Sequence, residues 1–350
     1  METLVDRINT DTPDKLIIQK YADIIKNGGL VAFPTETVYG LGANALDDSA
    51  VRKIFEVKNR PVNNPLIAHI SDIGMLETVA RDIPSGLERL FAAFWPGALT
   101  VVLPKRAAVP LSVTAGGETV AVRCPSHPVA GELIRLSGVP IVAPSANLSG
   151  RPSPTCFEHV YTDLYGKVSG IIDGGRCDIG IESTVVIPKG KSVLKILRPG
   201  AVTPQMLEKC GFEAHVDKNV LAPVKDNTVV ASPGMLYRHY APRASMEIVR
   251  GDDDDVISYI NEKIVQSGAD GKIGVLCFDG ERELYRNAFV IEYGSADNPL
   301  SLSKNLFAAL RRFDEADVTK IYARVIKPCG LGLGIYNRML RAASFNVTSL

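Results

Sequence analysis

Short apolar runs alternate with helix-spaced apolar positions along the first part of the chain. Residues 30–33 are apolar and lie between a glycine pair and a proline, so they predict a buried strand. In residues 48–58 the apolar positions follow helical spacing after Asp47, a favourable N-cap residue. This helix is expected to end before Pro61, because proline disfavours helical geometry in the residue that precedes it. The apolar run 66–70 then predicts a second strand.

The same alternation continues to residue 211 and predicts one α/β domain. Further strands are expected at 99–103, 118–123, 141–143, 171–175, 185–188 and 193–197, and further helices at 15–27, 87–94, 127–136 and from Thr203. Residues 109–117 are expected to form a flexible, polar connection.

The rest of the chain predicts a linker at 212–244 and a smaller α/β domain at 245–350. The linker shows little periodicity and contains three prolines. In the second domain, strands are expected at 247–249, 273–278, 289–293 and 321–326, and helices from Asp252, at 302–313 and at 335–343. The glycine string 330–334 between a strand and a helix suggests a dinucleotide site. We expect none, because the chain is expected to end before the next strand and its acidic residue.

Composition narrows the possible functions. Lys plus Arg and Asp plus Glu both number 39, so the formal net charge is zero. This argues against sequence-independent nucleic-acid binding, which needs a basic excess or a basic face, but it allows one cationic cleft. The six cysteines include no CxxC pair and therefore give no zinc or redox signature. Without a secretory or membrane-spanning run, we expect a cytoplasmic protein with no membrane partner.

Polar side chains gather where the predicted strands end, and open α/β sheets bind ligands at strand ends. Residues 35–37 (Thr-Glu-Thr) follow the first strand, and Lys58, Arg60 and Asn64 precede the next one. Taken singly, each has a structural explanation. Cations at a helix C-terminus complement the helix dipole, and a histidine inside a strand, such as His69, is most often a satisfied core residue. Together they suggest a cationic pocket.

Two further groups are ambiguous by themselves. Arg123 at the end of a strand could contact an anion or be an exposed edge charge, and the spacing favours neither. Ser145, Asn147 and Ser153 lie on a loop rich in glycine and proline, where they could donate to phosphate oxygens or simply form turns. The chain has no GxxxxGK[ST] string, so phosphates would be held by side-chain cations and loop amides.

The order of these motifs resembles the threonylcarbamoyl-AMP synthase family, which has the YrdC-type fold. The family's Lys-x-Arg signature stands here as Lys58-Asn59-Arg60, and its Ser-x-Asn signature as Ser145-Ala146-Asn147. Asn59 stands where the family more often has glycine. The resemblance implies a YrdC-like twisted open mixed sheet with helices, followed by a smaller Rossmann-like α/β accessory domain. It also implies condensation of L-threonine, bicarbonate and ATP into an adenylate used to modify adenosine in tRNA.

The resemblance also implies roles for individual residues. The catalytic group is Lys58, Arg60, Ser145 and Asn147. ATP would be bound by Arg60, Asn64, Thr119, Ser145, Ser153, Arg198 and Tyr240, and L-threonine by Thr35, His69, Arg123, Ala143 and Ser183. The string 232–242 in the linker matches a family signature, so Tyr237, Arg238, His239 and Tyr240 are expected in a lid; a linker packed on a domain surface is the alternative.

The expected cofactor is Mg²⁺ carried by ATP, with no metal ligands assigned among the side chains. The expected partners are the three substrates, the downstream tRNA threonylcarbamoyl transferase machinery and, weakly, RNA. Two alternatives remain. One is a non-catalytic RNA-binding module of the same fold. The other is a carbamoyltransferase that makes a carbamoyl adenylate, although such enzymes are larger proteins with CxxC zinc-finger modules, which this sequence lacks.

Overall fold

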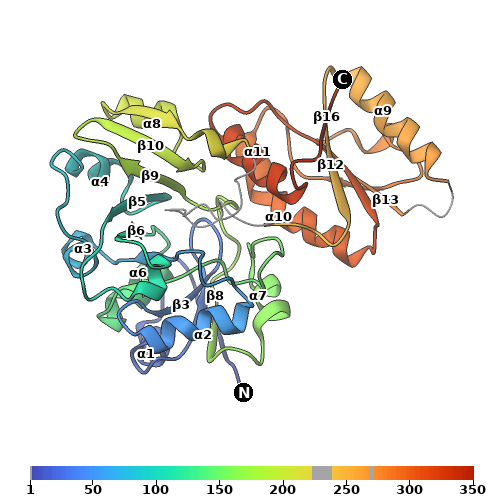
Figure 1. Ribbon diagram of the computed structural model, residues 1–350. Helices are drawn as coiled ribbons and strands as arrows, with labels where there is room; N and C mark the ends of the chain where they lie inside the picture. The colour runs from blue at the N-terminus through green and yellow to red at the C-terminus, as the bar shows by residue number, and fades with distance from the viewer. Residues whose placement is uncertain (1, 223–238, 269–271) are drawn as a thin grey trace. The chain divides into compact units, whose positions relative to one another are not determined.

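The computed structural model describes residues 2–222, 239–268 and 272–350, which divide into two compact units (Figure 1). The N-terminal unit contains residues 2–149 and 153–220. The C-terminal unit contains residues 150–152, 221–222 and the described residues from 239 to 350. Within these described ranges, no helix combines the length and the hydrophobicity needed to cross a bilayer.

The N-terminal unit is built on an eleven-stranded mixed sheet, in the order β1-β8-β2-β3-β7-β4-β6-β5-β9-β10-β11. The strands are β1 (Leu4–Arg7), β2 (Val31–Phe33), β3 (Gly40–Asn44), β4 (Ile67–His69), β5 (Leu99–Pro104), β6 (Thr119–Arg123), β7 (Ile141–Val142), β8 (Gly170–Asp173), β9 (Thr184–Pro188), β10 (Val193–Arg198) and β11 (Glu213–Val216). The helices are α1 (Lys15–Lys26), α2 (Asp48–Lys58), α3 (Ile73–Val79), α4 (Glu88–Phe94), α5 (Leu111–Thr114), α6 (Pro128–Ser137), α7 (Phe157–Leu164) and α8 (Pro204–Lys209).

The residues that flank α2 and α8 explain where these two helices begin and where α2 ends. The Asp47 side chain accepts hydrogen bonds from the first amides of α2, as its N-cap position predicts. Asn59 closes α2 in the left-handed conformation, with φ 49° and ψ 46°. Thr203 caps α8, which has proline in its first turn.

The expected strands and helices of this unit are present, together with six elements that were not expected. The strands β1, β3 and β11 and the helices α3 and α7 were not expected, and the connection 109–117 contains the short helix α5. β3 has the sequence GLGAN, in which the glycines obscure a strand pattern. The structure requires Gly42, because a Cβ there would lie 2.7 Å from the Phe33 ring and 2.9 Å from Ile141.

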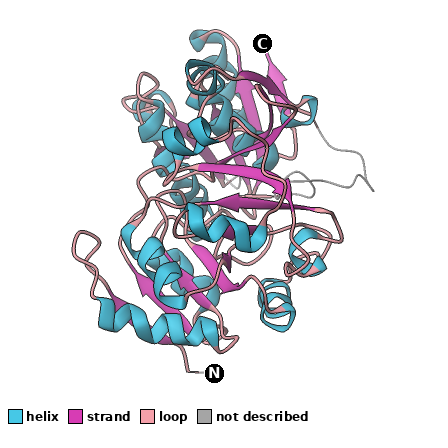
Figure 2. Cartoon of the chain, turned by 90° about the vertical axis from the view of Figure 1, so that its left-hand side faces the viewer, coloured by secondary structure: helices cyan, strands magenta, loops and turns pink. Residues whose placement is uncertain are grey.

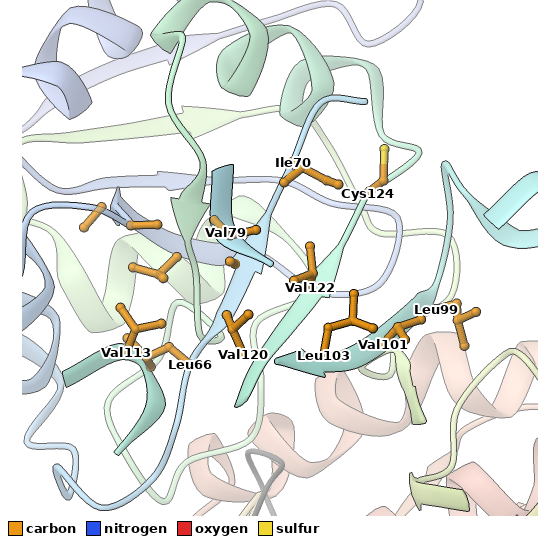
Figure 3. Close-up of a cluster of buried hydrophobic side chains, with 14 of the residues drawn as sticks. Leu66, Ile70, Val79, Leu99, Val101, Leu103, Val113, Val120, Val122 and Cys124 are labelled. Atoms are coloured by element: carbon orange, nitrogen blue, oxygen red, sulfur yellow. The ribbon is translucent and has the colours of Figure 1, made fainter. Parts of the chain in front are cut away.

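The two faces of the sheet at β4, β6 and β5 belong to different apolar clusters. On one face Val101, Val120 and Val122 belong to the large apolar core shown in Figure 3. On the other face Ala121 belongs to a small buried cluster with residues from the neighbouring strands. Thr119 and Arg123 share that second face with Ala121, because side chains alternate along a strand. This face therefore has an apolar floor with a polar residue at each end of β6.

The C-terminal unit contains a five-stranded, entirely parallel sheet in the order β14-β13-β15-β12-β16. Its elements are β12 (Ser245–Arg250), α9 (Asp253–Gln266), β13 (Ile273–Cys277), β14 (Phe289–Glu292), α10 (Pro299–Glu315), β15 (Lys320–Arg324), α11 (Leu331–Ala342) and β16 (Val347–Ser349). Figure 2 shows helices beside strands in each unit. The strand β16 follows α11, so the expectation that the chain ends before another strand was wrong.

Candidate active site

A row of polar side chains crosses neighbouring strands of the N-terminal unit. His69 at the carboxyl end of β4 lies opposite Arg123 on β6, and Arg123 lies opposite Thr100 on β5. The Thr100 and Ser183 hydroxyl oxygens are 2.7 Å apart. Arg198 continues the row, because its Nε and Nη2 donate to the backbone oxygen and the hydroxyl of Ser183 at 3.0 and 3.1 Å. Four of the expected site residues, His69, Arg123, Ser183 and Arg198, therefore belong to one row across neighbouring strands, in which Ser183 and Arg198 are hydrogen-bonded to each other.

Arg123 is buried at the centre of this row, which excludes the exposed edge charge considered above. Its side chain is only 5% exposed and lies 2.7 Å from an oxygen of Glu36. Its Nη1 donates to the Thr37 hydroxyl at 2.9 Å, and its Nε donates to the Gly97 carbonyl at 3.2 Å. Burial raises the pKa of Glu36, but the adjacent charge and hydrogen bond of Arg123 outweigh burial and hold that pKa below its ordinary value.

His69 is buried beside this ion pair and is uncharged near neutral pH. Burial, reinforced by the positive charge of Arg123, lowers the pKa of His69 to about 3. Its Nδ1 lies 3.1 Å from the Ile67 carbonyl, and its ring meets the Phe33 ring edge-on at 6.5 Å. A neutral imidazole places a polar group in the site without adding a second cation.

The loop between β2 and β3 holds Thr35 next to Thr37, which accepts from Arg123. The Thr35 hydroxyl donates to the Val38 carbonyl at 2.6 Å, and its oxygen lies 2.9 Å from the Thr37 hydroxyl. The loop is also tied to the segment before β9, since the amides of Ile179 and Gly180 donate to the carbonyls of residues 36 and 37. Turn chemistry thus holds the loop and the Arg123 pair in one arrangement.

Lys58 joins the two family signatures directly. Its side chain is buried at the end of α2, and its Nζ donates to the carbonyl oxygens of Ser145 and Asn147. The Lys58 carbonyl accepts from the Ser149 amide at 2.9 Å. Ala143, just before this loop, donates from its backbone to the Ile67 carbonyl at 3.0 Å. The structure therefore brings the expected catalytic residues Lys58, Ser145 and Asn147 together.

Arg60, Asn64 and Thr119 lie at the opposite ends of the strands from His69 and Arg123. The Arg60 Nη2 donates to the carbonyls of Asn64 and Pro65 at 3.2 and 3.0 Å, just before β4 begins. Thr119 begins β6, which runs parallel to β4. At ~3.3 Å per residue, four steps along β6 separate Thr119 from Arg123 by about 13 Å. Three of the expected ATP residues thus lie at the opposite end of this strand face from Arg123, whereas Arg198, also an expected ATP residue, lies beside Ser183 in the row.

The remaining expected site residues are Ser153 and the lid residues. Ser153 is fully buried, and its hydroxyl donates to Glu182 at 2.5 Å within the N-terminal unit. Tyr240 belongs to the C-terminal unit, where its ring lies 5.5 Å from the His239 ring and 5.1 Å from the Phe307 ring. Tyr237 and Arg238 lie outside the described residues.

Comparisons with known proteins now identify the family. A family model described as "Telomere recombination" matches residues 23–200, and one described as "Threonylcarbamoyl-AMP synthase, C-terminal domain" matches residues 202–344. The threonylcarbamoyl-AMP synthase of Pyrococcus abyssi is 46% identical over 331 residues, covering 93% of this chain and 94% of that relative. This chain belongs to the threonylcarbamoyl-AMP synthase family. The resemblance stated from the sequence motifs is confirmed.

Other members of the threonylcarbamoyl-AMP synthase family support the same assignment. The Bacillus subtilis synthase is 44% identical over 345 residues, covering 98% of this chain and 97% of that relative. A crystal structure described as Pyrococcus abyssi Sua5 complexed with L-threonine matches with a TM-score of 0.93 and 43% identity, covering 99% of this chain and all of that one. The expected fold class, a large mixed sheet with a smaller α/β domain, is confirmed.

The structure adds residues to the site that were not assigned from the sequence. Glu36 and Thr37 contact Arg123, Thr100 contacts Ser183, and Glu182 accepts from Ser153. Glu36 and Thr37 belong to the polar turn that the sequence analysis singled out, so their signal was present. No feature of the sequence marked Thr100 as a site residue, because it lies in an otherwise apolar strand pattern where threonine is common.

Proposed function

We propose that this chain is an L-threonylcarbamoyladenylate synthase. It would condense L-threonine, bicarbonate and ATP to threonylcarbamoyl-AMP and pyrophosphate, and its product would serve threonylcarbamoyl modification of adenosine in tRNA. The observation on which this rests is the buried Arg123–Glu36 pair at the strand ends, beside a neutral His69.

A buried ion pair of this kind complements an amino acid. A free amino acid has one carboxylate and one ammonium group, and Arg123 and Glu36 offer one charge of each opposite sign. The planar guanidinium group suits bidentate recognition of a carboxylate. The hydroxyls of Thr35 and Ser183 and the backbone at Ala143 would orient the remainder of L-threonine. His69, with a pKa of about 3, would contribute contact without a net charge.

The nucleotide would extend from this pair toward the other end of β6. Lys58, Ser145 and Asn147 would lie against its phosphates, with Arg60, Asn64, Thr119, Ser153, Arg198 and Tyr240 as the remaining expected ATP contacts. Because the Lys58 Nζ donates hydrogen bonds to the carbonyls of Ser145 and Asn147, Lys58 would also hold in place the loop that carries these two residues. The apolar floor around Ala121 would face the uncharged part of the ligand.

The proposed chemistry needs positioning and charge stabilisation rather than a protein nucleophile. The threonine amine and bicarbonate would form a carbamate with loss of water. A carbamate oxygen would then bond to the α-phosphorus of ATP as the bond to pyrophosphate breaks. Negative charge grows on the phosphate oxygens in that transition state, and fixed cations such as Lys58, Arg60 and Arg198 would stabilise it. Holding the carbamate beside the phosphorus supplies much of the remaining acceleration.

Mg²⁺ is proposed to arrive with ATP. Among residues 2–222, 239–268 and 272–350, no group of three or more His, Cys, Asp or Glu side chains is arranged to hold a metal ion. Mg²⁺ is commonly held by substrate phosphates with few protein ligands, so this side-chain set fits a nucleotide-borne ion. We also propose that the chain is cytoplasmic, that its product passes to the tRNA threonylcarbamoyl transferase machinery, and that it binds RNA weakly.

Pyrophosphate release tests the proposal. We expect release from Mg-ATP only when L-threonine and bicarbonate are both present. Release without threonine would contradict it. Release that requires carbamoyl phosphate in place of threonine and bicarbonate would instead indicate a carbamoyltransferase. No release under any of these conditions, together with RNA binding, would indicate the non-catalytic alternative.

A further inference from the structure

The C-terminal unit contains a cavity at the carboxyl ends of its central parallel strands. The cavity is lined by Arg250 and Gly251 at the end of β12, by Phe278 after β13 and by residues 325–329 after β15. β13 and β15 are neighbours, and the chain leaves them toward opposite edges of the sheet, from β13 to β14 and from β15 through α11 to β16. Open α/β sheets bind ligands in the crevice where the connections diverge in this way.

The size and the walls of the cavity suit a small organic molecule. Its volume is about 650 Å³, inside the range of roughly 300–1,000 Å³ typical of small-molecule sites. Val256, Phe278, Ile326 and Tyr336 contribute apolar and aromatic wall. Phe278 and Tyr336 are nearly buried, at 7% and 6% exposure, so these rings are fixed in place.

The charges around the cavity favour an anion. Arg324, buried in the wall, is neutralised by ion pairs with Asp253 and Glu281. Arg250 and Lys327 line the cavity and are exposed to solvent, and neither forms an ion pair among the described residues of this unit. Arg250 only donates to the Ser349 hydroxyl at 2.8 Å. Two cations therefore remain available to a ligand at the mouth of an apolar cavity.

The glycine string beside the cavity has a packing role. A Cβ on Gly332 would lie 2.5 Å from the Lys327 carbonyl, so this glycine lets α11 begin against the loop that follows β15. We assign no ligand contact to the string.

We propose that this cavity binds an organic anion with a planar apolar body, the chemical class that includes nucleoside monophosphates. The anionic group meets Arg250 and Lys327, and the ring system lies against the apolar and aromatic wall. The site is independent of the proposed catalytic function, since all of its residues belong to the C-terminal unit.

Cys329 provides a local readout. It lines the cavity and is exposed, whereas the five other cysteines are buried or partly buried. The rate of Cys329 alkylation by N-ethylmaleimide, measured on the full chain by peptide mass spectrometry, therefore reports occupancy here and not in the N-terminal unit. AMP at about ten times its Kd should slow labelling about tenfold, because the free fraction falls as 1/(1 + [L]/Kd).

Two ligand fragments and two variants make the test specific. Adenosine and inorganic phosphate, added singly at the same concentration, should protect Cys329 far less than AMP. Lys327→Glu should remove most of the AMP protection, while Arg286→Glu, an equal charge change at an exposed cation outside the cavity, should keep it. Each variant is compared with and without AMP, which cancels any change in thiol reactivity. Absence of AMP protection, equal protection by adenosine, or retained protection in Lys327→Glu would overturn the proposal.

Discussion

Arg123 is tolerated inside the sheet because its charge is paired with Glu36 and two of its nitrogens donate to protein oxygens, while its Nη2 makes no hydrogen bond among the described residues and can serve a ligand. One nitrogen faces Glu36, a second donates to Thr37, and a third donates to the Gly97 carbonyl. Removing one member of such a buried pair leaves an uncompensated charge, which is far more costly than losing an exposed pair. The arrangement depends on the fork geometry of arginine and not only on its charge.

Arg123→Lys is therefore expected to impair threonine binding strongly while the chain still folds. A lysine keeps the charge but loses the planar fork and cannot reach all three acceptors. We expect pyrophosphate release to fall by about two to three orders of magnitude, the size of effect seen when one fixed charge-stabilising donor is removed. Arg135→Lys, at an exposed arginine paired with Glu132 on α6, is the matched control and should behave as wild type. Unchanged threonine affinity in Arg123→Lys would contradict the assignment.

His69 predicts that stability falls in mild acid. Its pKa drops from 6.5 in the unfolded chain to about 3 on folding, so the unfolded state binds more protons between these values. Stability therefore rises with pH across this window and is lost as pH falls below 6.5, by at most about 1.4 kcal/mol per pH unit for this group. Glu36 adds a loss below its ordinary pKa of 4.5, because folding lowers the pKa of Glu36.

Urea unfolding at pH 7 and pH 5 measures this dependence. His69→Gln should be less stable at pH 7 but should show a clearly smaller loss between the two pH values. The quantity to compare is the slope of the free energy of unfolding against pH in each protein. Burial also lowers the pKa of His127, so His127 adds to this slope in both proteins. An unchanged slope in His69→Gln would show that His69 is not the titrating group.

At the scale of helices and strands, the sequence predicted best the elements whose pattern lies within their own residues. Continuous apolar runs predicted β5 and β9, and capping residues predicted the start of α2. The strand β3 was missed because its glycines are required by Phe33 and Ile141, which come from other strands. The burial of Arg123 could not be predicted for a similar reason. Its partner Glu36 lies on a distant loop, and local spacing contains no information about that pairing.

Asn59 shows how a departure from the family motif can be physically conservative. It ends α2 with φ 49° and ψ 46°, a conformation that glycine adopts freely and asparagine tolerates. Asn59→Gly should thus leave stability and activity near wild type. Asn59→Val should cost about 1–2 kcal/mol, because a β-branched residue is strained at positive φ. Urea unfolding of both variants checks this, and equal stabilities would contradict it.

At the scale of the whole molecule, each unit has a large buried apolar cluster made of its own described residues. The cluster that contains Ile260 in the C-terminal unit draws on α9 and on strands β12 to β15, within residues 249–322. The large core of the N-terminal unit draws on residues 30–212. Cores that do not share side chains can lose stability independently. A substitution deep in one of them is expected to act on that unit first.

Ile260→Ala tests this independence. Ile260 is fully buried on α9, so its truncation should destabilise the C-terminal unit by about 2–5 kcal/mol through lost burial and the cavity left behind. Differential scanning calorimetry should show one transition shifted to lower temperature and a second transition unchanged, with threonine affinity retained below the first. Ile54→Ala, at an equally buried isoleucine on α2, should shift the other transition. A single transition that shifts as a whole in both variants would show that the units unfold together, and that the separation of their cores does not make them independent.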